Sequence, residues 1–216
     1  MKYIYLSIFI IFMLIHLYAS YKNANNLRKI TKGFIMLSLF GFYHTSVATV
    51  SWLVVVAILL SWAGDMLLMI RGLKGFIPGG IAFLGSHLFY IFAFNELFNI
   101  NNIKIIYIIG IILAYLIATM IIFYKLKPHL KTILMIPMIL YLVVNGLMNS
   151  FAWFRMIGGF NFASLITVVG AILFFISDAA LFFVRFNKES KMKSHFLVML
   201  TYSLSEFLII LGFILC

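Results

Sequence analysis

The sequence predicts an all-α protein, a polytopic transmembrane helical bundle of about eight spans that forms one domain over residues 1–216. Of the 216 residues, 65% are hydrophobic and only 10% are charged, whereas about a quarter of a typical soluble domain is charged. The hydrophobic residues fall in runs of about 20, the length that an α-helix needs to cross a hydrocarbon core of about 30 Å. The composition therefore excludes a soluble enzyme and favours a multi-pass protein of the cell (inner) membrane.

The apolar runs predict the helices in order along the chain. They cover residues 3–21, 33–45, 47–70, 76–98, 104–124, 132–154, 163–185 and 195–215. The boundaries between them are the charged clusters at 22–32, 71–74, 125–131 and 185–193, the turn at 44–46, and the single cations Lys104 and Arg155. The first run resembles a signal peptide, but four cations follow it and only one, Lys2, precedes it. We therefore expect it to be an uncleaved first span.

The cations predict the orientation of the spans, because lysine and arginine accumulate in cytoplasmic loops. The chain has 16 of them against five acidic residues, a net charge of +11. With eight spans, 13 cations fall on one side, namely Lys22, Arg28, Lys29, Lys32, Arg71, Lys74, Lys125, Lys127, Lys131, Arg185, Lys188, Lys191 and Lys193, and three on the other, namely Lys2, Lys104 and Arg155. If the second run did not cross, the division would be 10 to 6. We therefore predict eight crossings with both termini outside the cytoplasm, and no role in nucleic-acid binding.

Acidic side chains inside lipid are the first candidates for a functional site, because each costs about 2.5 to 3.5 kcal/mol on insertion scales. Glu96 lies near the outer end of its predicted span and Glu189 lies in a loop, so three candidates remain: Asp65, Asp178 and Glu206. Asp65 precedes Arg71 by six residues and Asp178 precedes Arg185 by seven, which predicts similar depths about 9 to 10 Å from the cytoplasmic helix ends. No lysine or arginine lies inside a predicted span. We therefore expect the two aspartates to share one cavity, where at least one holds a proton near neutral pH, as acid–base catalysis requires.

Further polar residues recur at helical spacing in other spans. They are His87 and Tyr90, Tyr141 and Asn145, and Tyr202 and Glu206, together with Ser177 beside Asp178. We expect them to line a polar cavity that opens to the cytoplasmic leaflet. The alternative for Asn145, Ser177 and the tyrosines is hydrogen bonding between helices, and for His87 it is a packed, neutral histidine. The sequence has no HxxxH or HExxH spacing, so we expect no metal site and no cofactor.

Four segments carry a resemblance to a known family. They are GDMLLMI at 64–70, FIPGGIAFLGSHLFYIFAF at 76–94, YLVVNGLMNSFA at 141–152 and GAILFFISDAALFFVRF at 170–186. In this combination the chain resembles the YhhN-type lysoplasmalogenase family. The resemblance implies an eight-span hydrolase that cleaves the vinyl ether bond of lysoplasmalogens, releasing a fatty aldehyde and glycerophosphoethanolamine or glycerophosphocholine. The two aspartates of the family fall on Asp65 and Asp178, whereas Glu206 stands where the family usually has glutamine.

The chemistry that the resemblance implies is similar to that of a glycosidase, with two carboxyl groups and an oxocarbenium-like transition state. One aspartate would protonate the vinyl carbon, and the other would stabilise the cation and direct water. The expected supporting roles are orientation of a carboxylate or water by His87 and Tyr90, contact with glycerol oxygens by Tyr202 and Asn145, and binding of the lipid phosphate by Lys32, Arg71 and Arg185. The expected partners are a lysophospholipid substrate and membrane lipids, with no obligate protein partner. A proton-coupled transporter or a lipid-binding membrane protein is the alternative.

Overall fold

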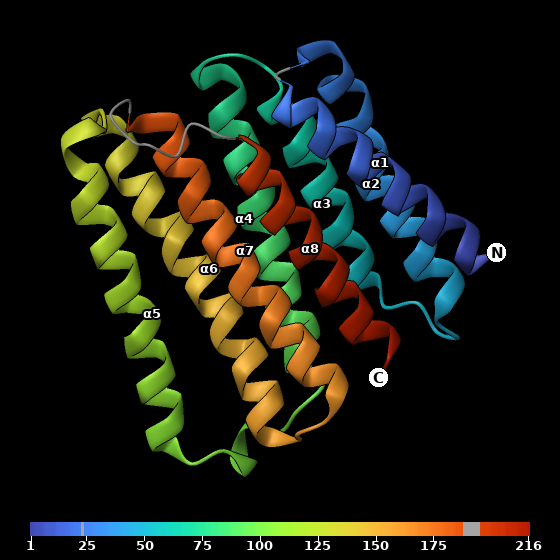
Figure 1. Cartoon of the computed structure of the whole chain (residues 1–216). Coiled ribbons are helices and arrows are strands. Elements are labelled where there is room, and N and C mark those ends of the chain that lie inside the picture. Colours follow the sequence, from blue (N-terminus) through green and yellow to red (C-terminus); the bar gives the residue numbers. More distant parts are fainter. Residues whose placement is uncertain (23, 188–194) are drawn as a thin grey trace. The chain divides into compact units, whose positions relative to one another are not determined.

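The computed structural model describes residues 1–22, 24–187 and 195–216, which form helices and no strand. The α-helices are α1 (Lys2–Tyr21), α2 (Asn25–Ser46), α3 (Trp52–Leu68), α4 (Leu73–Asn95), α5 (Ile105–Leu126), α6 (Thr132–Gly158), α7 (Phe162–Phe186) and α8 (His195–Ile214), with short 3₁₀ helices η1 (Ile100–Asn102) and η2 (Lys127–His129) (Figure 1). The predicted all-α class is confirmed, and each predicted helix corresponds to one of the eight. The loop cations predicted at Lys188, Lys191 and Lys193 lie outside the described residues.

Five helices continue past their predicted ends and include a cation there; α1, α4 and α5 do so by one to three residues, and α2 and α6 by more. α2 begins at Asn25 instead of residue 33, and α6 ends at Gly158 instead of residue 154. Lys32 and Arg155 therefore lie within helices. Arg155 lies in a segment long and apolar enough to cross a membrane, so the prediction that no lysine or arginine lies inside a span is wrong for Arg155. The physical reason is that an apolar run is broken by a cation, whereas a helix tolerates a cation that finds an acceptor on a neighbouring helix.

Six helical segments of the described chain are long and apolar enough to cross a membrane: Lys2–Tyr21, Leu73–Asn95, Ile105–His129, Thr132–Gly158, Phe162–Phe186 and His195–Ile214. The apolar helix α3 is shorter, at 17 residues. α2 has 22 residues but carries Arg28, Lys29 and Lys32. A multi-pass membrane protein follows from these helices, while eight crossings and the orientation of the termini stay predictions.

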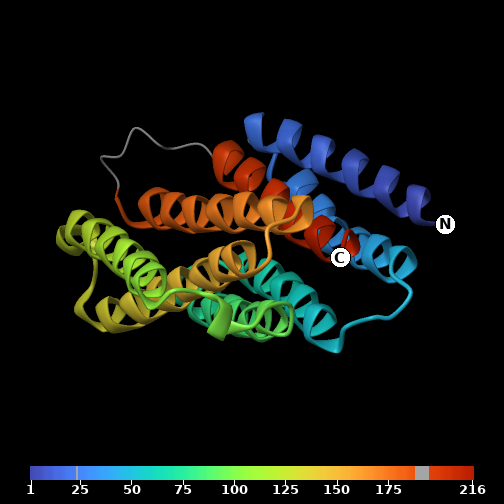
Figure 2. The ribbon, with the colours of Figure 1, turned by 90° about the horizontal axis from the view of Figure 1, so that it is seen from below.

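The helices belong to two compact units. The first consists of residues 1–93 and 213–216, and the second of residues 94–212. Within the first unit, α2 lies beside α1 and α3 (Figures 1 and 2). Within the second unit, α6 lies beside α5 and α7 (Figure 1). Both candidate aspartates are thus carried by helices, Asp65 on α3 of the first unit and Asp178 on α7 of the second.

Glycines set the closest approaches between neighbouring helices. A Cβ atom on Gly64 would lie 2.6 Å from the ring of Phe83, so α3 and α4 can pack here only without a side chain. A Cβ atom on Gly170 would lie 2.9 Å from backbone atoms of Ser205 and Ile209, which brings α7 against α8. Gly72, between α3 and α4, has φ of 83°, a left-handed conformation that glycine adopts readily. Asp65, which follows Gly64, therefore lies at the close contact between α3 and α4.

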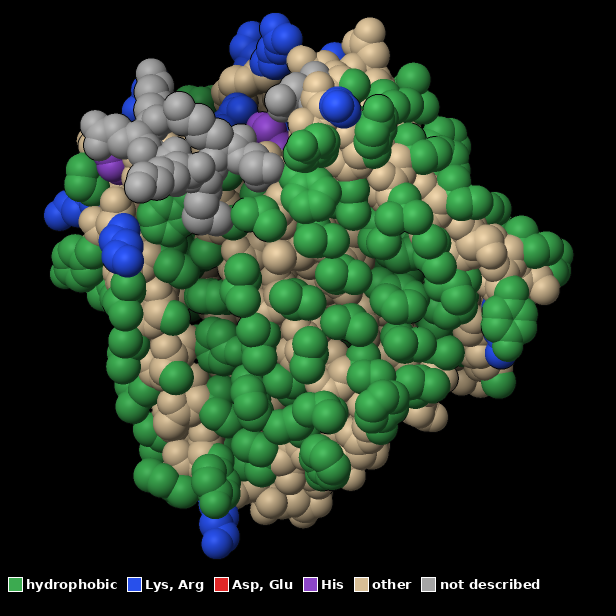
Figure 3. Space-filling model, viewed as in Figure 1, with side chains coloured by type: hydrophobic (Ala, Val, Ile, Leu, Met, Phe, Trp, Pro, Cys, Tyr) green, Lys and Arg blue, Asp and Glu red, His purple; other side chains and the backbone are tan. Residues whose placement is uncertain are grey.

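The outward surface of the helices is hydrophobic. Green side chains cover the middle of the face seen in Figure 3, and the blue Lys and Arg side chains in that view lie toward the helix ends. Ile105 is 67% exposed and Ile136 is 78% exposed, and along α5 only Thr119 and Leu126 are buried. Because lipid is as apolar as these side chains, such a surface suits direct contact with a bilayer.

Candidate functional site

Asp65 forms an ion pair with Lys32 between α3 and α2. The Lys32 ammonium lies 3.0 Å from Asp65 Oδ1, and the side chains are 14% and 2% exposed. The indole nitrogen of Trp62, one turn before Asp65, donates to the carbonyl of Gly33 at 3.1 Å and holds α3 against α2 at this point. The sequence analysis expected no lysine or arginine to neutralise Asp65, but the structure gives it a cationic partner. Lys32, predicted to bind a phosphate at the membrane rim, contacts the carboxylate instead.

The same unit contains the two predicted site residues of α4. His87 and Tyr90 are fully buried. Next to His87, the hydroxyl of Ser86 lies 2.8 Å from the hydroxyl of Ser61, which is one turn before Asp65 on α3. The ring of Tyr90 stacks on Phe213, with centroids 6.5 Å apart. α4 thus carries both side chains in the interior, and their predicted role in orienting a carboxylate or water stays a prediction.

Asp178 accepts hydrogen bonds from two neutral donors of α6. Its Oδ2 atom accepts hydrogen bonds from the Tyr141 hydroxyl at 2.6 Å and from the Asn145 amide nitrogen at 2.6 Å. Tyr141 and Asn145 are one turn apart on α6, and all three side chains are buried. The structure therefore brings Asp178 together with the Tyr141 and Asn145 pair of α6. Asn145 directs its amide nitrogen at the carboxylate, and its predicted contact with glycerol oxygens stays a prediction.

The remaining predicted residues of the second unit lie in the interior or at its edge. The Ser177 hydroxyl donates to the carbonyl of Val198 at 2.9 Å, so it joins α7 to α8 as the interhelical alternative proposed for it. Tyr202 packs edge-on against Phe174, with ring centroids 5.6 Å apart, and Glu206 is fully buried on α8. Arg185 is exposed at the end of α7, as Arg71 is after α3 in the first unit. Both arginines are thus accessible, as phosphate binding would need.

Two further features of the second unit were missed by the sequence analysis. The Arg155 side chain is 3% exposed and donates to Thr167 Oγ1 at 2.7 Å and to the Gly212 carbonyl at 2.9 Å. Asn149, one turn beyond Asn145 on α6, donates to the Asn145 carbonyl at 3.1 Å and to its Oδ1 atom at 3.0 Å. Both are visible in the sequence as polar residues at the carboxyl-terminal part of a helix, but a hydropathy pattern does not indicate that they are buried.

The polar contacts of α6 continue to α5. The Tyr115 hydroxyl donates to Asn149 Oδ1 at 3.1 Å, and the Trp153 indole nitrogen donates to the Tyr115 hydroxyl at 3.2 Å. A chain of hydrogen bonds thus runs from Trp153 through Tyr115, Asn149 and Asn145 to Asp178. No group of three or more His, Cys, Asp or Glu side chains that could hold a metal ion occurs among residues 1–22, 24–187 and 195–216.

Comparison with known proteins gives one match. The sequence profile of the YhhN family matches residues 27–213, from the start of α2 almost to the end of α8. The match includes both aspartates and every side chain that contacts them in the hydrogen bonds and ion pair above. No curated protein and no solved structure matches the chain.

Proposed function

Because the chain belongs to the YhhN family, we propose that it is a membrane-embedded hydrolase that cleaves the vinyl ether bond of a lysoplasmalogen. The products would be a fatty aldehyde and glycerophosphoethanolamine or glycerophosphocholine. One observation supports this proposal most strongly: Asp65 and Asp178 are both buried, and different kinds of side chain contact them. A lysine ammonium accompanies Asp65, and neutral donors accompany Asp178. Two carboxyl groups in different environments are suited to different roles in acid–base catalysis.

Asp178 is proposed to act as the carboxylate that stabilises the cation and activates water. Its Oδ2 atom accepts two hydrogen bonds of 2.6 Å, from Tyr141 and Asn145. An amide nitrogen can only donate, so the Oδ2 atom facing Asn145 must act as an acceptor. Hydrogen bonds to a charged oxygen are shorter and stronger than those between neutral groups. These donors therefore favour an ionised Asp178 before the reaction begins.

Asp65 is proposed to act as the acid, with Lys32 controlling when it carries a proton. While the ammonium lies 3.0 Å from Asp65 Oδ1, it favours the ionised carboxylate. A lipid phosphate is an alternative anionic partner for the same ammonium. We propose that Lys32 turns to the phosphate when substrate binds, and that Asp65 then takes up the proton that it later donates. This combines the predicted phosphate-binding role of Lys32 with its observed position.

The proposed reaction conserves atoms and charge at each step. Asp65 donates its proton to the vinyl carbon that bears the alkyl chain, which leaves an oxocarbenium ion at the carbon attached to oxygen. Water adds to that carbon, and Asp178 takes the proton that the water loses. The resulting hemiacetal transfers its hydroxyl proton to the ether oxygen and separates into an aldehyde and an alcohol. A proton then returns from Asp178 to Asp65 through solvent.

The other predicted residues keep supporting roles in the proposal. Arg71 and Arg185 are exposed at helix ends and are proposed to contact the phosphate from the cytoplasmic side. Four buried side chains, His87, Tyr90, Tyr202 and Glu206, are proposed to orient water and the glycerol oxygens. Ser177 is not assigned such a role, because its hydroxyl donates a hydrogen bond to the Val198 carbonyl.

The test is aldehyde release by the purified full-length protein in lipid nanodiscs. The wild type should convert a vinyl-ether lysophospholipid to aldehyde and leave the saturated alkyl-ether analogue intact, since only an enol ether can be protonated at carbon. Asp65→Asn and Asp178→Asn should each lower the rate by at least about 100-fold, while Glu96→Gln, at an exposed carboxylate, should keep the wild-type rate. Normal aldehyde release by either aspartate variant would contradict the two-carboxylate scheme. Binding or movement of the lipid without product would favour the transporter or lipid-binding alternative.

A further inference from the structure

A polar stripe follows one face of α6 at intervals of one turn. It consists of Tyr141, Asn145, Asn149 and Trp153, each four residues after the one before. Residues four apart on an α-helix lie one above the other. The first two contact Asp178, and the last two contact Tyr115 of α5. A single helix face therefore connects the carboxylate of α7 with a tyrosine of α5.

The direction of each hydrogen bond at the α5 end is determined by chemistry. The indole nitrogen of Trp153 can only donate, so the Tyr115 oxygen accepts at 3.2 Å. The single hydroxyl proton of Tyr115 is then available to Asn149, whose Oδ1 atom lies 3.1 Å away. Asn149 consequently presents its oxygen to α5 and its amide nitrogen to the preceding turn of α6.

The direction is determined at the other end as well. The Asn149 nitrogen donates to the backbone carbonyl of Asn145 at 3.1 Å, and a carbonyl can only accept. The same nitrogen donates to the side-chain Oδ1 of Asn145 at 3.0 Å. This contact leaves the Asn145 nitrogen facing Asp178 Oδ2 at 2.6 Å. If the Asn145 amide rotated by half a turn, its oxygen would face the carboxylate and its nitrogen would face another amide nitrogen.

We propose that Tyr115, Asn149 and Trp153 form a positioning relay that keeps the donor side of the Asn145 amide directed at Asp178. The proposal rests on the proposed function in that Asp178 is the carboxylate that acts on water. All donors of the relay point toward Asp178, and hydrogen bonds aligned in this way strengthen one another. The relay residues act through Asn145 and have no contact with Asp178 in these hydrogen bonds, so they are positioning residues.

Packing around the relay leaves little freedom for an alternative arrangement. Asn145 and Asn149 have no exposed surface, so no bulk water replaces a lost partner. The ring of Tyr115 packs edge-on against Phe175 of α7, with centroids 5.4 Å apart. A Cβ atom on Gly146 would lie 3.1 Å from the Tyr115 Cβ, and the small residue lets α5 approach α6. The relay is thus held in place from α5, α6 and α7 together.

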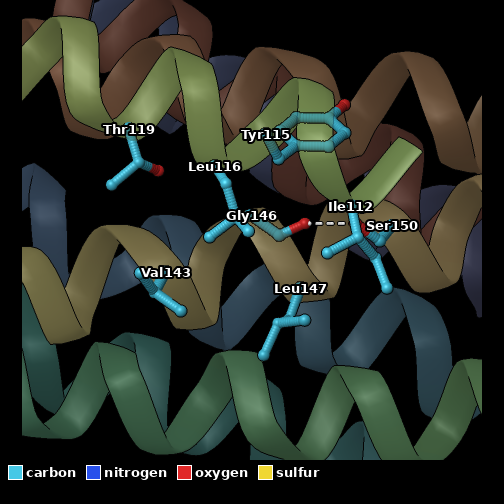
Figure 4. A pocket seen from close by; sticks show the side chains of 8 residues that line it. All are labelled: Ile112, Tyr115, Leu116, Thr119, Val143, Gly146, Leu147 and Ser150. Atoms are coloured by element: carbon cyan, nitrogen blue, oxygen red, sulfur yellow. Dashed lines mark hydrogen bonds between the residues drawn. The ribbon is translucent and has the colours of Figure 1, made fainter. Parts of the chain in front are cut away.

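A hollow between α5 and α6 supplies a matched control for the test. Tyr115 and Thr119 both line it (Figure 4). The Thr119 hydroxyl donates to the Leu142 carbonyl on α6 at 3.5 Å. Thr119→Val therefore removes a hydroxyl that α5 directs at α6, one turn from Tyr115, without touching the relay.

The kinetic experiment compares Tyr115→Phe, Asn149→Ala and Thr119→Val in nanodiscs with a vinyl-ether lysophospholipid. Tyr115→Phe should lower kcat by about 3- to 10-fold, as expected for the loss of one hydrogen bond, and should change KM by less than about 2-fold. Thr119→Val should keep both wild-type values. Because Tyr115 acts through Asn149, the double variant should be no slower than Asn149→Ala alone. Equal kcat values for Tyr115→Phe and Thr119→Val would overturn the relay.

A spectroscopic readout separates the relay from the proposed function. The infrared bands of the Asp178 carboxyl group are obtained as the difference between the wild type and Asp178→Asn. Tyr115→Phe should shift these bands, since the oxygen of Asn149 then loses its donor and the amide of Asn145 is held less firmly, whereas Thr119→Val should not. If the wild type releases no aldehyde, the proposed function fails, and the infrared bands of Asp178 alone then test whether the relay exists. Unshifted bands in Tyr115→Phe would overturn the relay whether or not the protein is active. If Asn149→Ala does not fold, Tyr115→Phe still provides the test, because it keeps the aromatic ring that packs between the helices.

Discussion

Replacement of Lys32 by methionine tests the ion pair that joins α2 to α3. Methionine keeps the unbranched apolar part of the side chain but removes the ammonium that lies 3.0 Å from Asp65 Oδ1. Asp65 is only 2% exposed, so water replaces little of what is lost. Removal of one partner from a buried ion pair typically costs about 3 to 5 kcal/mol. We therefore expect Lys32→Met to be among the strongly destabilising single substitutions in the first unit.

Protonation of Asp65 sets an upper limit on this cost. An ordinary aspartic acid near pH 4 lies about 3 pH units below pH 7, and each unit corresponds to about 1.4 kcal/mol, so taking up a proton costs about 4 kcal/mol at pH 7. At pH 5 the same step costs about 1.5 kcal/mol. The native variant then binds a proton that the unfolded chain lacks, so its stability rises as the pH falls toward about 4. The deficit relative to the wild type should accordingly shrink over this range.

Thermal unfolding in nanodiscs, followed by circular dichroism at pH 7 and at pH 5, measures the deficit. A loss of about 3 to 4 kcal/mol corresponds to a decrease in Tm of about 6 to 16 °C at pH 7 for a chain of this length. The double variant Lys32→Met, Asp65→Asn should recover most of it, because a neutral amide needs no cation. Lys74→Met, at an exposed lysine, is the matched control. A Tm for Lys32→Met that equals the control, or a deficit that grows at pH 5, would refute the reasoning.

Two further substitutions test the packing around the candidate site by the same unfolding measurement. Gly64→Ala should lower stability by about 1 to 3 kcal/mol, since the new methyl group would lie 2.6 Å from the Phe83 ring. Phe83→Leu in the same chain should restore part of the loss. An unchanged Tm for Gly64→Ala would contradict the close approach of the two helices. Arg155→Met should cost about 2 to 4 kcal/mol, because its guanidinium is buried and donates to Thr167 Oγ1 at 2.7 Å. Arg71→Met, at an exposed arginine, should be nearly neutral, and equal Tm values for the two arginine variants would argue against a structural role for Arg155.

The helices could be predicted from the sequence because the run of apolar residues is a property of the chain itself. The predicted span 163–185 corresponds to Phe162–Phe186, and the span 104–124 to Ile105–Leu126. The ends at Lys32 and Arg155 could not be predicted in the same way. Whether a cation ends a helix or continues it depends on an acceptor such as Asp65 or the Gly212 carbonyl, which comes from another helix.

The sequence indicated several of the buried polar side chains but not the contacts between them. The cost of burying a carboxylate selected Asp65 and Asp178, and helical spacing selected Tyr141 and Asn145. Spacing on one helix does not say which neighbour a side chain meets, so the contact of Asn145 with Asp178 became visible only in the structure. The stripe on α6 was detectable in full, since Asn149 continues the same four-residue interval.

The Lys32–Asp65 ion pair also bears on how the polypeptide enters the bilayer. A lysine at the centre of an isolated span costs about 2.5 to 3.5 kcal/mol on insertion scales, and α2, with Lys32, is not among the helices apolar enough to cross on their own. Pairing with the carboxylate of α3 makes the two helices together electrically neutral at this contact, and the Trp62–Gly33 hydrogen bond holds them beside each other. During synthesis, α2 is therefore better suited to leave the translocation channel with α3 as a hairpin than to enter the lipid alone.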